Sequence, residues 1–172
     1  MTEEARAPIM VELANESATA ALAAKLAAAA RPGDVFALKG ALGSGKTVFA
    51  RAFINARAAA PEEVPSPTFT LVQAYAFPDP LLGSDGTVPV YHFDLFRIAD
   101  AAETRELGME DAFADGISLI EWPEKLNGRL PDDRLEITLD QGPTPDSRHA
   151  RLVGHGSWRR RLDAIAGSKR RD

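Results

Sequence analysis

The chain has 172 residues, of which 45% are hydrophobic and 26% charged, a composition typical of a globular protein with a sizeable core. Its formal net charge of −5 excludes binding of DNA or RNA through bulk positive charge, although local contacts remain open. Cysteine is absent, which excludes disulfides and thiolate metal sites. No apolar run is long enough to span a bilayer, and we expect one cytoplasmic domain over residues 1–172 with a basic tail from about 167.

Short apolar segments alternate with longer helical patterns along the chain, which is typical of an α/β fold. The predicted strands cover residues 9–13, 35–38, 68–77, 88–96, 117–120, 134–140 and 149–153. The predicted helices run from a cap at Asn15 or Ser17 to about 30, from 46 to about 59, through short segments within 101–114, and over 157–165. We predict a three-layer sandwich of the P-loop NTPase type, with a mainly parallel central sheet and antiparallel edge strands that include 134–140 and 149–153.

The strongest motif is Gly-Ala-Leu-Gly-Ser-Gly-Lys-Thr over residues 40–47, which follows a predicted strand and opens a predicted helix. Its glycines let backbone N–H groups converge on phosphate oxygens, and the helix N-terminus adds partial positive charge. Lys46 can reach the β- and γ-phosphates of a nucleoside triphosphate, and the Thr47 hydroxyl can bind Mg²⁺. The predicted nucleotide contacts in this region are Leu42, Gly43, Ser44, Gly45, Lys46, Thr47 and Val48.

Two carboxylates at strand ends can supply the Mg²⁺ and water-orienting groups that a P-loop hydrolase needs. Glu121 ends a short apolar strand, as a Walker B acid does, and Asp94 lies among aromatic and apolar neighbours. We predict Thr47 and Glu121 as metal ligands, and Lys46, Asp94 and Glu121 as catalytic residues. The alternative for each acid is a cap or an ion pair, for example between Asp94 and Arg97.

Several other polar and aromatic residues have two interpretations each. The hydroxyls of residues 66–68 can sense a γ-phosphate, as switch loops do, or form a simple turn. Trp122 can stack on adenine or pack in the core, and His92 suits a packed position better than a proton relay. The basic clusters at 159–161 and 169–171 can touch RNA, but a solvated face and tail is the preferred interpretation.

Four motifs, taken together, resemble the bacterial TsaE (YjeE) family in their order and spacing. They lie at residues 38–47, 66–71 (Ser-Pro-Thr-Phe-Thr-Leu), 91–97 (Tyr-His-Phe-Asp-Leu-Phe-Arg) and 121–124 (Glu-Trp-Pro-Glu), within a similarity that extends from about 17 to 139. The resemblance implies a small Mg²⁺-dependent ATPase that supports synthesis of N6-threonylcarbamoyladenosine in tRNA together with TsaD and TsaB. In that family TsaD performs the transfer, and tRNA is reached through the complex.

The resemblance also implies roles for single residues. Lys46 matches the phosphate position, Thr47 and Glu121 the Mg²⁺ positions, and Asp94 an acid that activates water or contacts the metal from the outer shell. Ser66 and Thr68 match a switch-like loop that contributes to the nucleotide site, and Trp122 matches a Trp beside the nucleotide. His92 matches a family histidine whose role is open.

The chain departs from the family pattern in a few places. Ala41 stands where the family commonly has Asp, so a polar contact is lost, and Ser44 replaces Ala at a variable loop position. Phe96 stands where Tyr is frequent, which rules out a hydroxyl contact. The loop over 78–87 is longer than usual and receives no function.

Two other functions remain open on the residues alone. A small P-loop kinase would need an arginine-rich lid, which the stretch after Gly83 lacks. A nucleotide-gated module would bind the nucleotide to cement a complex without hydrolysing it. No arginine finger is evident in the chain itself, so we expect slow hydrolysis until a partner completes the site.

Overall fold

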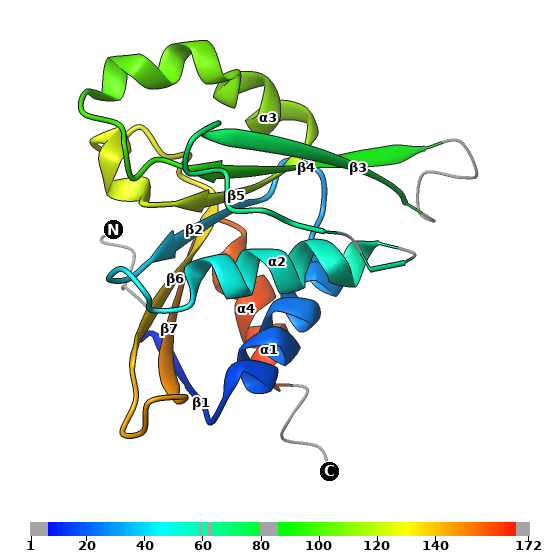
Figure 1. The fold of residues 1–172 in the computed structure, drawn as a ribbon. Coiled ribbons are helices and arrows are strands. Elements are labelled where there is room, and N and C mark those ends of the chain that lie inside the picture. The colour runs from blue at the N-terminus through cyan, green and yellow to red at the C-terminus, as the bar shows by residue number, and fades with distance from the viewer. Residues whose placement is uncertain (1–6, 59, 62, 80–85, 168–172) are drawn as a thin grey trace, which may run out of the picture.

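The computed structural model describes residues 7–58, 60–61, 63–79 and 86–167 (Figure 1). In this part of the chain, seven strands form one sheet in the order β1-β7-β6-β2-β5-β4-β3. The strands are β1 (Ile9–Leu13), β2 (Val35–Lys39), β3 (Val72–Pro78), β4 (Thr87–Asp94), β5 (Ile117–Glu121), β6 (Arg134–Gln141) and β7 (Arg148–His155). The central strands β6, β2, β5 and β4 are parallel, whereas β3, β7 and β1 pair antiparallel at the edges. The predicted mainly parallel sheet with antiparallel edges is therefore confirmed. Residues 134–140, predicted as an antiparallel edge strand, instead form the internal strand β6, which pairs parallel to β2 and antiparallel only to β7.

Helices cover both faces of this sheet and complete the three layers (Figure 1). One face carries α1 (Glu16–Ala29), α2 (Lys46–Arg57) and α4 (Trp158–Gly167), and the other carries the 3₁₀ helix η2 (Ala101–Leu107), α3 (Met109–Asp115) and the 3₁₀ helix η3 (Pro123–Leu126). As predicted, Asn15 caps α1, because its side chain accepts a hydrogen bond from the Ala18 N–H at 2.9 Å. Among the described residues, no helix is long and apolar enough to cross a membrane.

Aromatic packing fixes α2 and α4 against the central strand. Phe36 on β2 is fully buried and meets Phe53 of α2 edge-on at 4.9 Å between ring centroids and Trp158 of α4 at 5.3 Å. Because β2 runs directly into the glycine-rich loop, this packing also fixes the start of that loop. The core therefore holds the loop at the carboxyl edge of the parallel strands, where ligands bind in such sheets.

The strand predicted over 68–77 begins later, at Val72. Residues before it form a turn: the Leu71 N–H donates to the Pro67 carbonyl at 2.6 Å, and Leu71 has a positive φ of 67°. A residue in that conformation cannot continue a strand. The prediction was wrong here because the apolar pattern of the segment conceals a turn that folds over the end of β4.

The cluster at 159–161 was predicted to be solvated, and for Arg161 this was wrong. Its guanidinium forms a two-point ion pair with Asp34, at 2.7 and 2.8 Å, and lies 3.9 Å from the centroid of the Trp158 ring. Burial of α4 against β7 and the loop before β2 brings these residues together. The 169–171 cluster and most of the 78–87 loop, residues 80–85, lie outside the described residues.

Candidate nucleotide-binding site

The loop over residues 40–47 has a backbone shape that side chains would obstruct. Gly40, Gly43 and Gly45 adopt positive φ values of 142°, 79° and 105°. A Cβ on Gly40 would also collide with the Ser44 hydroxyl and the Leu139 carbonyl. These glycines let the chain turn tightly from β2 into α2, so that the loop lies at the N-terminus of α2, where an anion is stabilised.

Lys46 closes this loop with its own side chain. Its Nζ donates to the carbonyls of Gly40 at 2.6 Å and Ala41 at 2.9 Å, and lies 4.1 Å from the centroid of the Trp122 ring. Burial lowers the pKa of Lys46, and three nearby carboxylates oppose that shift. The ammonium group is therefore held at the loop, at the position from which it can meet a phosphate.

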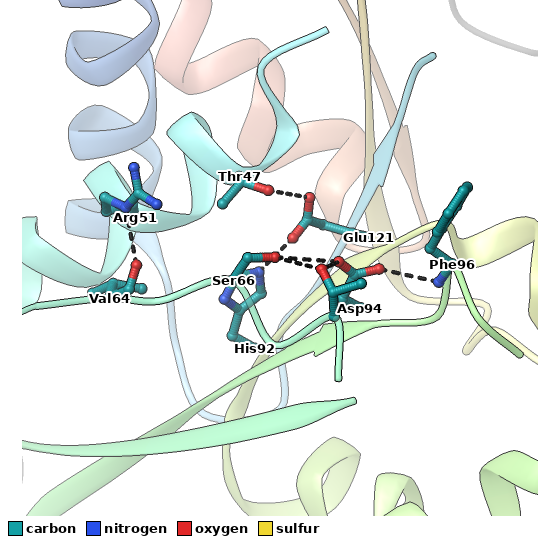
Figure 2. A network of polar contacts seen from close by, with 9 residues as sticks. Thr47, Arg51, Val64, Ser66, His92, Asp94, Phe96 and Glu121 are labelled. Atoms are coloured by element: carbon teal, nitrogen blue, oxygen red, sulfur yellow. Dashed lines mark hydrogen bonds and ion pairs between the residues drawn. The ribbon is translucent and has the colours of Figure 1, made fainter. Parts of the chain in front are cut away.

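Glu121 lies between α2 and β4 at the end of β5. Its Oε1 accepts a hydrogen bond from the Thr47 hydroxyl at 2.8 Å, and its Oε2 lies 2.7 Å from His92 Nε2. Figure 2 shows these side chains pointing toward one another from three different elements. Asp94 pairs with Glu121 in the register of β4 and β5, so both predicted acids lie at the same edge of the sheet.

Asp94 holds the turn that precedes β3. Its Oδ2 accepts hydrogen bonds from Thr68 Oγ1 at 3.1 Å and from Ser66 Oγ at 3.5 Å, and its Oδ1 accepts one from the Phe96 N–H at 3.0 Å (Figure 2). The switch-like segment is thus bound directly to one of the candidate catalytic acids. The suggested partner of Asp94, Arg97, instead lies over the Phe69 ring, at 4.2 Å from its centroid.

Trp122 is the N-cap residue that precedes η3 and has a positive φ of 60°, an unusual conformation for a bulky residue. Its ring is half-buried and lies 5.0 Å from that of Phe96 and against the ammonium of Lys46. The indole therefore lies at the lysine end of the loop. Backbone strain at such a position is common at ligand-binding sites.

The predicted site residues converge on one cavity of about 370 Å³. Its lining comprises Leu42, Gly43, Gly45, Lys46, Thr47, Val48, Ser66, Thr68, Asp94, Phe96, Glu121, Trp122 and Arg148. Of the predicted site residues, only Ser44 does not line this cavity. Ser44 is buried within the loop, and its hydroxyl has no hydrogen-bond partner among the described residues.

Arg148 is the lining residue that the sequence motifs missed. From the start of β7 its Nε donates to the Ser44 carbonyl at 3.0 Å, and its Nη2 donates to the Gly43 carbonyl at 3.3 Å. It follows a turn-rich stretch, Gly-Pro-Thr-Pro-Asp over 142–146, and nothing local marks it as a site residue. Its approach to the loop depends on the antiparallel pairing of β6 and β7, which sequence spacing does not reveal.

A second cavity, of about 380 Å³, adjoins the first and shares Gly45, Val48 and Arg148 with it. Its other lining residues are Asn15, Glu16, Ser17, Thr19, Pro145 and Asp146. The cavity lies on the α1 side of the loop, and its polar and acidic lining offers acceptors and donors to a ligand. The loop therefore lies between two cavities, one at the carboxylates and one at the start of α1.

The oxygen donors around Thr47 suit Mg²⁺. The Thr47 hydroxyl and the Glu121 carboxylate are 2.8 Å apart, beside the glycine-rich loop at the start of α2. Among the described residues, no group of three or more His, Cys, Asp or Glu side chains could hold a metal ion. This arrangement fits Mg²⁺, which commonly takes one or two protein ligands and completes its shell with water and substrate phosphates.

The sheet order and the glycine-rich loop between β2 and α2 define an α/β protein of the P-loop class. Comparison with known proteins identifies the family within this class. The family model described as "Threonylcarbamoyl adenosine biosynthesis protein TsaE" matches residues 13–150. The chain therefore belongs to the TsaE family, as the sequence resemblance implied.

Individual relatives agree with this assignment. The chain is 38% identical to the tRNA threonylcarbamoyladenosine biosynthesis protein TsaE of Bacillus subtilis over 126 residues, which cover 73% of each chain. It is 37% identical to the TsaE protein of Haemophilus influenzae over 117 residues, 67% of each chain. A crystal structure of Bacillus subtilis YdiB superposes with a TM-score of 0.76 at 27% identity and covers 98% of this chain and 99% of that one.

Proposed function

We propose that this protein is a cytoplasmic, Mg²⁺-dependent ATPase that supports synthesis of N6-threonylcarbamoyladenosine in tRNA together with TsaD and TsaB. The family membership supports the pathway. The observation that carries the ATPase activity is the convergence of Lys46, Thr47, Asp94 and Glu121 on one cavity at the loop. A site that combines a phosphate-binding loop with two buried acids can bind a triphosphate and orient water.

The described side chains have different roles in such a reaction. Loop amides and Lys46 bind the phosphates, and Thr47 with Glu121 holds Mg²⁺, which neutralises charge on the phosphates when it is bound. Asp94 orients or deprotonates the attacking water, from a position where the Ser66 and Thr68 hydroxyls hold its Oδ2. The second cavity, which adjoins the loop at Gly45, Val48 and Arg148, would accommodate the nucleoside.

An apolar rim around the first cavity supports docking of a partner over it. Leu42 and Phe69 are 78% and 80% exposed, and Phe96 is 43% exposed, which is unusual for such large apolar side chains. Arg148 is the one arginine of the described cavity lining, and it is bound to loop carbonyls. A partner would therefore both cover the rim and supply the missing transition-state cation.

Variants of the two acids test hydrolysis separately from binding. We expect Asp94→Asn and Glu121→Gln to bind a fluorescent ATP analogue within a few-fold of the parent protein but to lose about 100-fold or more in turnover, as removal of a catalytic acid or base does. Complex assembly and tRNA modification are measured in parallel. Full tRNA modification by both variants would favour the non-hydrolysing module, and a phosphorylated small-molecule product would favour the kinase.

A further inference from the structure

We propose that His92 is a positioning residue that holds the Glu121 carboxylate in the orientation that Mg²⁺ requires. This role rests on the proposed function, because it concerns the same metal. His92 is fully buried on β4, two residues before Asp94, and its Nε2 lies 2.7 Å from Glu121 Oε2. The histidine thus contacts a predicted metal ligand directly.

The two oxygens of Glu121 have different partners. Oε2 faces His92 on β4, while Oε1 accepts the Thr47 hydroxyl from α2 at 2.8 Å (Figure 2). Each partner fixes one oxygen, and the parallel pairing of β4 with β5 fixes the backbone between them. Since Thr47 and Glu121 would both hold Mg²⁺, His92 is the partner of this carboxylate that would not itself be a metal ligand.

The surroundings of the ring define which nitrogen carries the proton. Nδ1 of His92 is buried and has no hydrogen-bond partner among the described residues. A proton on Nδ1 would leave a buried N–H unsatisfied and set two acceptors against each other at the 2.7 Å contact with Glu121. A proton on Nε2 removes the clash of acceptors at this contact, so His92 donates to Glu121 Oε2.

A contribution to folding stability does not explain why a polar pair occupies this buried position. His92 and Glu121 have side-chain exposures of 0% and 3%, and a buried pair of this kind is often no more stabilising than packed apolar side chains. His92 also does not line the cavity, whereas Glu121 does. It can act on a ligand only through Glu121, as the groups that orient metal ligands from a second layer do.

Nucleotide binding with and without Mg²⁺ tests this role. The parent protein, His92→Gln and His92→Leu are titrated with a non-hydrolysable ATP analogue, first in excess chelator and then at increasing Mg²⁺. Glutamine can place an N–H near the position of Nε2, whereas leucine cannot. We expect equal binding of all three proteins in chelator, and a Mg²⁺ affinity lowered about 10-fold or more in His92→Leu but largely retained in His92→Gln, the size of effect that such orienting contacts have.

The folding of each variant is checked by thermal unfolding, and His92→Asn, whose amide is too short to reach Oε2, replaces the leucine variant if that variant does not fold. Nitrogen NMR of the His92 ring adds a direct measurement, for which we expect a proton on Nε2. Parent-like Mg²⁺ dependence in the variant that lacks the donor would overturn the positioning role alone. Lack of any Mg²⁺ effect in the parent protein would overturn the proposed function as well.

Discussion

Arg148 on β7 donates a hydrogen bond from its Nε to the Ser44 carbonyl at 3.0 Å, across 104 positions of the chain. A second bond reaches the Gly43 carbonyl at 3.3 Å, while Nη1 binds the carbonyls of Pro145 and Ser147. One guanidinium thereby links the glycine-rich loop to the turn between β6 and β7. The loop is supported from outside the segment that contains its motif.

Replacement of Arg148 by Ala should weaken nucleotide binding. A hydrogen bond to a charged group contributes about 1.5–3 kcal/mol, so we expect at least a tenfold rise in the dissociation constant for ATP, measured by isothermal titration calorimetry. Arg151→Ala is the matched control, because Arg151 is exposed on the same strand. Equal affinities for the two variants would show that the link to Ser44 is dispensable.

If a partner docks on the exposed apolar rim, a substitution in the rim but outside the cavity should weaken assembly of the complex without weakening nucleotide binding. Phe69 is 80% exposed and does not line the cavity, so Phe69→Ser should bind nucleotide as the parent does. Loss of a large apolar anchor from an interface typically costs about 2 kcal/mol or more, and we expect affinity for TsaD with TsaB to fall by more than tenfold.

Biolayer interferometry with nucleotide present measures this affinity, with Met10→Ser as control. Met10 is 61% exposed but lies on β1, at the far edge of the sheet from β3 and the turn that carries Phe69. The partner surface lies elsewhere if Phe69→Ser assembles like the parent while Met10→Ser does not.

Arg161 should be important for stability rather than for RNA contact. It pairs with Asp34 at 2.7 and 2.8 Å, with side-chain exposures of 15% and 9%, and also donates to the Ala29 carbonyl. Removal of one member of a buried pair costs about 3 kcal/mol or more, so Arg161→Ala should lower the free energy of unfolding by that order in a urea titration. Arg160→Ala, at an exposed neighbouring position, should change it by less than about 0.5 kcal/mol. Similar unfolding curves for the two variants would contradict this assignment.

Lys39, Arg134 and His155 surround the Glu136 carboxylate, and this polar cluster predicts a loss of stability in acid. Burial acts to raise the pKa of Glu136, but hydrogen bonds from Lys39 and Arg134 outweigh it and lower the pKa below the usual 4.5. Burial, followed by repulsion from Arg134, lowers the pKa of His155 below its usual 6.5. For both groups the unfolded chain binds protons more readily than the folded one, so stability is complete above the unfolded pKa and is lost as pH falls through the folded pKa.

We therefore expect the free energy of unfolding to begin to fall below about pH 6.5 through His155 and to fall further below about pH 4.5 through Glu136. Chemical denaturation across this pH range measures the slope. Glu136→Gln should flatten the acid part of the curve, whereas Glu12→Gln, at an exposed position on β1, should leave it unchanged. An unaltered slope in Glu136→Gln would assign the acid sensitivity to other groups.

Local patterns were sufficient to predict most of the strands, the glycine-rich loop and the position of both acids at strand ends, because each occupies a short segment with its own chemistry. The segment from Thr68 to Leu71 was wrongly predicted as strand, because its polar and apolar residues alternate as they do in a strand. In the structure Leu71 has a positive φ and the segment turns back onto Asp94. Arg161 was misjudged for a different reason, because its partner Asp34 lies 127 positions away. Such contacts depend on the packing of elements, which periodicity along the chain does not record.

The central claim concerns Mg²⁺-dependent hydrolysis at the Lys46 loop, and phosphate release measures it most directly. Turnover per site is compared for the protein alone and in a complex with TsaD and TsaB, with Mg²⁺ or with chelator, and Lys46→Ala serves as the inactive reference. We predict slow Mg²⁺-dependent release by the protein alone, a tenfold or greater rise in the complex as a partner cation completes the site, and none from Lys46→Ala. Phosphate release that is equal in the parent and Lys46→Ala complexes, or absent from both, would contradict the account.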